Sequence, residues 1–278
     1  QSFNTQVRRS VGRLDEREVI LERLKMLSDY DQASVIIDLM YGLPYQSMAV
    51  WLEDLALLKE ACIDGFDLYQ LNVYQNSLLK SAVETGKIVA AATTIQQAEM
   101  FSRAVAYLED NLFRRISVTH WAKTNRERNL YNLLSKSGAT IALAGAGGGG
   151  NIDGVTVALE RNLQKYLKRI DGGEKPLVSM LQSNLKQDVQ KAVVYQIEQG
   201  YLDTAKLAAD YGTEMLELEE LLRIWESRGL ARRDNDIVKF TVAGQFWHVN
   251  MAQSVLECLN YILSGEKRTE YKSIAAQG

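Results

Sequence analysis

Residues 35–44 constrain the fold of this chain more than any other segment. An apolar run, Val35 to Leu39, is interrupted by a single acid, Asp38, and is followed by Gly42-Leu43-Pro44. Continuous apolar runs are typical of strands in parallel sheets that are buried on both faces, and glycine and proline end such strands. A carboxylate near the carboxyl end of the strand lies where α/β barrels place their ligand contacts. The segment therefore predicts a buried strand with Asp38 as a ligand-binding residue.

Helical and strand-like patterns alternate through the first half of the chain. Apolar spacing predicts helices at 14–30, 47–61, 93–111 and 125–137, and Ser47 is suited to cap the second of them. Runs rich in β-favouring residues predict strands at 34–40, 66–73, 113–118, 140–143 and 154–159. This alternation indicates βα units and a parallel sheet.

The glycine-rich segment 144–151 is expected to lie outside regular structure. It reads Ala-Gly-Ala-Gly-Gly-Gly-Gly-Asn, which permits either close approach of the backbone to a ligand or a flexible turn. It is not a dinucleotide-binding fingerprint, because a strand rather than a helix is expected to follow it.

The character of the chain changes after Gly172-Gly173-Glu174-Lys175-Pro176. Helices are expected at 177–200, 204–209, 215–228 and 245–263, with a strand at 236–241. Helices followed by a short hairpin and another helix predict a winged-helix domain. The predicted domains are therefore 1–172 and 173–278.

Composition excludes several classes of protein. The chain has 32 basic and 35 acidic residues, and the helix that would read DNA is acidic, so we expect no nucleic acid partner. No apolar run is long enough to span a membrane, so we expect no membrane partner. The two cysteines, Cys62 and Cys258, lie far apart, which argues against a disulfide scaffold and favours a reducing cytoplasm.

Two histidines are candidates for chemistry. His120 follows a predicted strand and His248 lies in the last predicted helix. Either could be an axial ligand of haem iron, and either could be an ordinary packed histidine.

The polar candidates carry similar alternatives. Asp38 could act as a general base or bind ribose hydroxyls, and Gln1 and Arg13 suit hydrogen bonding to a polar ligand or a structural role. Arg126 and Arg128 could face propionates or phosphates, or simply be solvated at a helix N-terminus.

Several segments resemble the oxygen-independent coproporphyrinogen oxidase family of radical SAM proteins. They are Gln1-Ser2-Phe3-Asn4, Arg13, Ile37-Asp38-Leu39-Met40-Tyr41-Gly42-Leu43-Pro44 and Leu68-Tyr69-Gln70-Leu71. Further segments are similar to the anaerobic haem-degrading branch of that family. They are Ser117-Val118-Thr119-His120-Trp121-Ala122, Glu127-Arg128-Asn129-Leu130-Tyr131-Asn132, Gly244-Gln245-Phe246-Trp247 and the loop at 145–150.

The resemblance implies the C-terminal portion of a partial (β/α)6 barrel followed by an α+β winged-helix domain. It implies S-adenosylmethionine (SAM) and a [4Fe–4S] cluster as cofactors and haem as the substrate. Gln1, Asp38 and Arg13 would contact the ribose and methionine part of SAM, Asn72 would line the adenosyl pocket, and Gly147 and Gly148 would pass close to adenine or substrate.

The same resemblance implies a longer enzyme. The three-cysteine cluster motif and the glycine-rich SAM motif of the family are not found in this sequence, so we expect the chain to be the C-terminal part, inactive alone. The full enzyme would methylate and open the haem macrocycle without oxygen, with an electron donor such as a flavodoxin-type protein. A haem-binding carrier and a coproporphyrinogen III oxidase are the alternatives.

Overall fold

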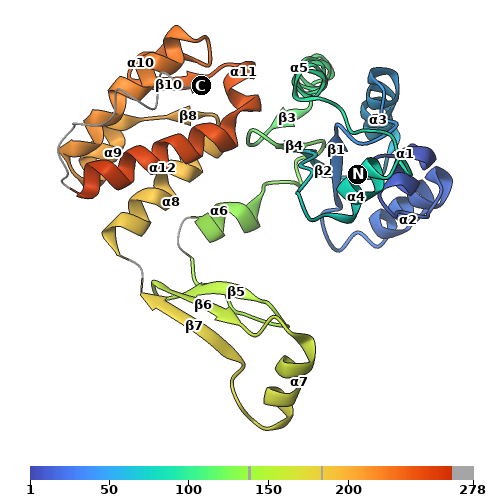
Figure 1. Cartoon of the computed structure of the whole chain (residues 1–278), viewed down its shortest axis with the longest axis horizontal. Coiled ribbons are helices and arrows are strands. Elements are labelled where there is room, and N and C mark those ends of the chain that lie inside the picture. Colours follow the sequence, from blue (N-terminus) through green and yellow to red (C-terminus); the bar gives the residue numbers. More distant parts are fainter. Residues whose placement is uncertain (137–138, 183, 265–278) are drawn as a thin grey trace. The chain divides into compact units, whose positions relative to one another are not determined.

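The structure is a computed structural model that describes residues 1–136, 139–182 and 184–264 (Figure 1). The chain forms two compact units. The first contains residues 1–129, 198–200 and 240–248, and the second contains 130–197, 201–239 and the described part of 249–278. The first continuous segment of the first unit ends at Asn129, and the domain boundary predicted at 172/173 falls within the 130–197 segment of the second unit.

The first unit is built on a four-stranded sheet with the strand order β1-β2-β4-β3. Its elements are α1 (Thr5–Ser10), α2 (Arg17–Asp29), β1 (Ile36–Tyr41), α3 (Met48–Glu60), β2 (Gly65–Gln70), α4 (Leu78–Glu84), α5 (Thr94–Asp110), β3 (Arg114–Arg115), β4 (His120–Ala122) and α11 (Val242–Phe246). As expected, Ser47 caps α3 by accepting a hydrogen bond from the backbone nitrogen of Val50.

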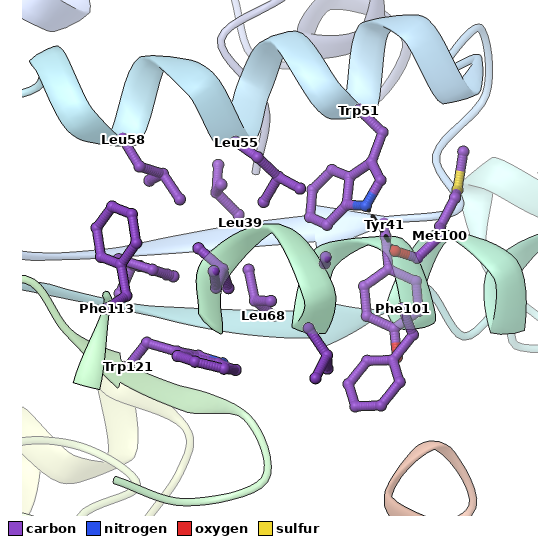
Figure 2. Packing of buried hydrophobic residues seen from close by; sticks show 14 of the residues in the cluster. Leu39, Tyr41, Trp51, Leu55, Leu58, Leu68, Met100, Phe101, Phe113 and Trp121 are labelled. Atoms are coloured by element: carbon purple, nitrogen blue, oxygen red, sulfur yellow. Dashed lines mark hydrogen bonds between the residues drawn. The ribbon is translucent and has the colours of Figure 1, made fainter. Parts of the chain in front are cut away.

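One face of this sheet carries the hydrophobic core. Leu39 and Leu68 are in register on β1 and β2, and Phe66 is in register with Trp121 of β4. Figure 2 shows Trp51 of α3 near these strands, with its indole nitrogen donating a hydrogen bond to the carbonyl oxygen of Met100 in α5 (2.9 Å). Helices α3 and α5 therefore cover the same face of the sheet.

Only part of this sheet is parallel. Strands β1 and β2 pair in parallel, but β4 runs antiparallel to both β2 and β3. The expected parallel pairing is therefore confirmed for β1 and β2 and is wrong for β3 and β4. The strand expected at 113–118 is instead the short β3, and residues 116–119 turn the chain directly into β4. A parallel neighbour would need a crossover connection of about a dozen residues or more, which this turn is too short to supply.

The second unit contains two three-stranded sheets, ordered β5-β6-β7 and β8-β10-β9. Its elements are α6 (Leu130–Lys136), β5 (Gly149–Ile152), β6 (Val155–Leu159), α7 (Leu163–Asp171), β7 (Leu177–Gln182), α8 (Leu185–Glu198), β8 (Tyr201–Leu202), α9 (Thr204–Tyr211), the 3₁₀ helix η1 (Thr213–Leu218), α10 (Glu219–Ser227), β9 (Ala231–Asp234), β10 (Ile237–Phe240) and α12 (His248–Ser264). The order from α8 to β10 is helix, strand, helix, 3₁₀ helix, helix and a β-hairpin, and the assignment of a winged-helix domain stays a prediction.

The helix expected over residues 177–200 begins later than predicted. Leu177–Gln182 is strand β7, which pairs antiparallel with β6, and helix α8 starts at Leu185. Pairing with β6 overrides the helical spacing of the apolar residues, as tertiary context often does for short segments.

The glycine-rich segment is partly regular structure, so its assignment as wholly irregular is wrong. Gly149 and Gly150 belong to β5. A Cβ atom on Gly150 would lie 2.6 Å from the carbonyl oxygen of Ile141, and the nitrogen of Ile141 donates to the carbonyl oxygen of Asn151 (2.7 Å). The strand expected at 140–143 is absent from the described residues; that segment instead crosses close to β5, which requires glycine there.

Candidate functional site

Three strands of the first unit place one polar side chain each in a row across the sheet. Asp38 of β1 is in register with Asp67 of β2, and Asp67 is in register with His120 of β4. Residues in register on neighbouring strands point to the same face, here the one opposite the face of Leu39 and Leu68. Asp38 thus lies on the face away from the core, and its contact with a ligand stays a prediction.

His120 lies between two carboxylates. Its Nδ1 is 3.0 Å from Asp67 Oδ2 and its Nε2 is 3.1 Å from Glu127 Oε1. Burial opposes protonation of the imidazole, but the carboxylates of Asp67 and Glu127 outweigh burial and raise the pKa of His120. The two carboxylates therefore favour the protonated form of the ring between them, and we call Asp38, Asp67, His120 and Glu127 the acidic row.

The arrangement leaves His120 unsuited to a metal. Both ring nitrogens face carboxylate oxygens, and the residue is only 3% exposed. A metal ligand needs a free lone pair on one nitrogen. The structure therefore gives the axial-ligand hypothesis for His120 no support.

Glu127 reaches His120 because Gly65 has no side chain. A Cβ atom on Gly65 would lie 2.7 Å from Glu127 Cγ and 2.9 Å from the carbonyl oxygen of Trp121. The Glu127 carboxylate also accepts a hydrogen bond from the backbone nitrogen of Asn129. This buried end of the acidic row is thus held by the backbone as well as by His120.

Asp38 is the exposed end of the acidic row. Partial burial, and then the negative charge of Asp67 beside it, raise the pKa of Asp38. The carboxylate pair Asp38–Asp67 therefore concentrates negative charge on an accessible part of the sheet face.

Gln1 and Arg13 lie next to Asp38, as the resemblance implies. The backbone nitrogen of Gln1 donates to the carbonyl oxygen of Asp38 (2.5 Å), and the nitrogen of Met40 donates to the carbonyl oxygen of Gln1 (2.8 Å). Arg13 Nε donates to Gln1 Oε1 (3.0 Å). The structure thus brings together the three residues predicted to contact SAM.

Asp54 of α3 holds this N-terminal segment against the sheet. Its carboxylate accepts hydrogen bonds from Ser2 Oγ (2.6 Å), the backbone nitrogen of Phe3 (2.7 Å) and Gln46 Nε2 (3.3 Å). Burial raises the pKa of Asp54, although these three donors partly oppose the shift. Asp54 therefore positions the N-terminal segment, a role that was not predicted from the sequence.

A second polar residue, Gln97 of α5, organises the carboxyl ends of β1 and β2. Its Nε2 donates to the carbonyl oxygen of Leu71 (3.1 Å), and its Oε1 accepts from Gln70 Nε2 (2.7 Å). Gly42, with φ of +88°, leaves room for this amide. Asn72 follows Leu71 directly and is exposed at this edge, where it was predicted to line the adenosyl pocket.

The two predicted substrate arginines differ in their surroundings. Arg126 pairs with Asp31 and donates to the carbonyl oxygen of Ala33 (3.1 Å), so its guanidinium fastens two loops together. Arg128 is exposed. Arg128 is thus better placed than Arg126 to meet a ligand carboxylate, and the substrate role of both residues stays a prediction.

His248 has the features that His120 lacks. Its Nδ1 lies 2.8 Å from the carbonyl oxygen of Gln245, which only a protonated Nδ1 can bond. Burial, and the nearby charge of Arg115, lower the pKa of His248. The neutral ring therefore keeps its lone pair on Nε2, which is how metal-ligating histidines are usually arranged.

Gly147 and Gly148 belong to the second unit and have structural partners there. Gly147, with φ of +76°, donates its backbone nitrogen to the carbonyl oxygen of Glu160 (2.8 Å), and Gly148 accepts from Leu159 (2.8 Å). These bonds begin the β5–β6 pairing. Their predicted contact with adenine or substrate stays a prediction.

The residues present do not fit an iron–sulfur cluster. Cys62 and Cys258 lie in different units and form no disulfide with each other, and no group of three or more potential metal ligands occurs in the part of the chain described. The acidic row, with Gln1 and Arg13 beside it, does fit a polar organic cation. No described helix is long and apolar enough to cross a membrane.

Comparisons with known proteins agree with this fold. No family model matches the chain. Anaerobilin synthase of Escherichia coli O157:H7 is 35% identical over 263 residues, which cover 94% of this chain and 58% of that protein. Oxygen-independent coproporphyrinogen III oxidase of Helicobacter pylori is 24% identical over 96% of this chain and 61% of that protein. The chain thus spans about three-fifths of the length of these relatives.

A solved structure defines the class of fold. Coproporphyrinogen III oxidase of Escherichia coli, a radical SAM enzyme, superposes with a TM-score of 0.71 at 18% identity over 93% of this chain and 62% of its own. The fold is therefore that of the C-terminal portion of a radical SAM barrel and its following domain. In sequence the chain is similar to anaerobilin synthase and to oxygen-independent coproporphyrinogen III oxidase, and in fold it is similar to a radical SAM enzyme.

Proposed function

We propose that this chain belongs to an enzyme that methylates and opens the haem macrocycle without oxygen, releasing iron and a linear tetrapyrrole. The observation that carries the proposal is the 35% identity to anaerobilin synthase, which extends over 94% of the chain. The acidic row supports it, because it provides an accessible, negatively charged face beside Gln1 and Arg13. SAM carries a sulfonium cation, which such a face would attract.

The proposal gives the residues of this chain definite roles. Asp38 and Gln1 would bind the ribose and methionine part of SAM, and Arg13 would hold the Gln1 amide in place. Asp54 would keep residues 2–3 docked on α3, so that Gln1 remains beside β1. When bound, SAM would supply both a radical and a methyl group for the reaction.

The [4Fe–4S] cluster would be held by cysteines outside this sequence, because Cys62 and Cys258 cannot supply a three-cysteine site. The chain alone would then be inactive. An electron donor such as a flavodoxin-type protein would reduce the cluster. Two cysteines that form no disulfide fit a reducing compartment such as the cytoplasm.

Incubation of the intact, cluster-reconstituted enzyme with haem, SAM and a reductant tests the proposal. We expect loss of the haem Soret band, release of iron and formation of a methylated linear tetrapyrrole, detected by mass spectrometry. A haem carrier would bind haem without consuming SAM. A coproporphyrinogen III oxidase would consume coproporphyrinogen III in a parallel reaction and leave haem intact, and either outcome would reject haem degradation.

A further inference from the structure

Asp67 is the residue of the acidic row to which sequence and family resemblance assign no role. It is in register between Asp38 and His120, and its side chain is 13% exposed, between the accessible carboxylate and the buried imidazole. Two carboxylates on neighbouring strands repel each other. If Asp67 served only to pair with His120, nothing would require a second acid, Asp38, beside it.

The charges of the acidic row do not balance. Asp38, Asp67 and Glu127 contribute three potential negative charges, whereas His120, even when protonated, contributes only one positive charge. Tyr69, which lies on the same face, adds none, because burial, followed by the charges of Asp67 and Asp38, raises its pKa to about 12. The Arg13 Nε is directed to the Gln1 amide oxygen rather than to a carboxylate. Among the described residues, no Lys or Arg side chain forms an ion pair with Asp38 or Asp67, and only the amino group of Gln1 lies beside Asp38.

We propose that Asp67 is a second carboxylate for the sulfonium cation of SAM, acting together with Asp38, and that His120 and Glu127 are positioning residues that hold it. A cation bound over the pair relieves the repulsion between the two carboxylates, whereas a neutral ligand would leave it in place. This inference rests on the proposed binding of SAM to this face.

The positioning roles follow from burial. His120 lies 3.0 Å from Asp67 Oδ2, so it limits the rotation of that carboxylate. Glu127 orients the ring from the other side and favours its protonated form, and Glu127 is itself fixed by the backbone nitrogen of Asn129. Substituting His120 with Gln should therefore weaken the effect of Asp67 without removing its charge.

Binding of SAM and of S-adenosylhomocysteine to the intact, reconstituted enzyme tests this inference by calorimetry. The two ligands share the ribose, adenine and amino acid, but only SAM carries the positive sulfur. Asp67→Asn should weaken SAM binding about tenfold and S-adenosylhomocysteine binding less than about twofold. His120→Gln should weaken SAM binding by an intermediate factor. Glu99→Gln, which removes an exposed acid of α5, is the matched control and should change neither.

A second variant that keeps the negative charge makes the test decisive even if substitution at position 67 affects folding. Asp67→Glu preserves the charge and should retain the preference for SAM over S-adenosylhomocysteine, even where its folding is weakened. Equal losses for both ligands in Asp67→Asn, or none, would overturn the inference. If the unmodified enzyme binds SAM but does not consume haem, the proposed reaction fails while the role of Asp67 stands. If Asp67→Asn binds SAM normally and haem is still degraded, only the present inference fails.

Discussion

Gly65→Ala offers a direct test of how the acidic row is assembled. The new methyl group would lie 2.7 Å from Glu127 Cγ and 2.9 Å from the carbonyl oxygen of Trp121. The Glu127 side chain can swing away, but the backbone of β4 cannot move without disturbing its pairing with β2. We therefore expect Glu127 to leave His120.

The expected cost combines two effects. Overpacking in a well-packed site typically costs about 1–3 kcal/mol. Breaking a buried ion pair costs about 3–5 kcal/mol when one partner is left buried, but a displaced Glu127 can reach water, so only a fraction of that applies. Together these effects predict a decrease of about 2–4 kcal/mol in the free energy of unfolding.

Two measurements on the Gly65→Ala variant separate these effects. Urea unfolding followed by tryptophan fluorescence reports the stability of the first unit, which contains the buried Trp51 and Trp121. An NMR titration reports the pKa of His120, which should fall because one carboxylate is lost. Gly149→Ala is the control, since a Cβ there would lie 4.0 Å from its nearest neighbour and should change stability by less than about 0.5 kcal/mol. A Gly65→Ala protein with normal stability and an unchanged His120 pKa would refute this account.

Three further predictions concern single groups. The pKa of His120 is raised in the folded protein, so the stabilisation by its charge is fully present below about pH 6.5 and is lost as the pH rises through the folded-state pKa. Urea unfolding at a series of pH values above 6.5 should therefore show a falling free energy of unfolding in the unmodified protein. The His120→Gln variant should not show this fall. Gly42→Ala should lower the free energy of unfolding by about 2–4 kcal/mol, because it strains a φ of +88° and displaces the Gln97 amide; a loss below about 0.5 kcal/mol would contradict this. His248→Ala should abolish the Soret shift of added ferric haem, and free imidazole should restore it; an unchanged spectrum would exclude His248 as the axial ligand.

Much of the first unit could be predicted from sequence because its signals are local. The cap at Ser47, the apolar stripe of α5 and the strand around Asp38 depend on residues a few positions apart, and all three appear where expected. The antiparallel β4 and strand β7 could not be predicted in the same way. Strand β4 depends on a short turn, and β7 depends on pairing with β6. Neither cause leaves a periodic pattern in the sequence.

The residues of the candidate site also differ in whether a local sequence pattern could predict them. Asp38 could be predicted because it interrupts an apolar run. Asp67 lies between Phe66 and Leu68 in the same way, so the same pattern pointed to Asp67 but was not used. The contact between His120 and Glu127 could not be predicted, because it crosses an irregular loop. It also depends on the absence of a side chain at Gly65, in a strand more than fifty residues earlier.

The two faces of the sheet explain why these acids belong together. Leu39 and Leu68 are immediate neighbours of Asp38 and Asp67 in sequence, so the strand alternation that buries the leucines places both carboxylates on the opposite face. A one-residue shift in the pairing of β1 with β2 would break both the apolar layer and the carboxylate pair. The core packing therefore sets the register of the acidic row, and a ligand bound there rests on a face whose geometry is fixed before the ligand arrives.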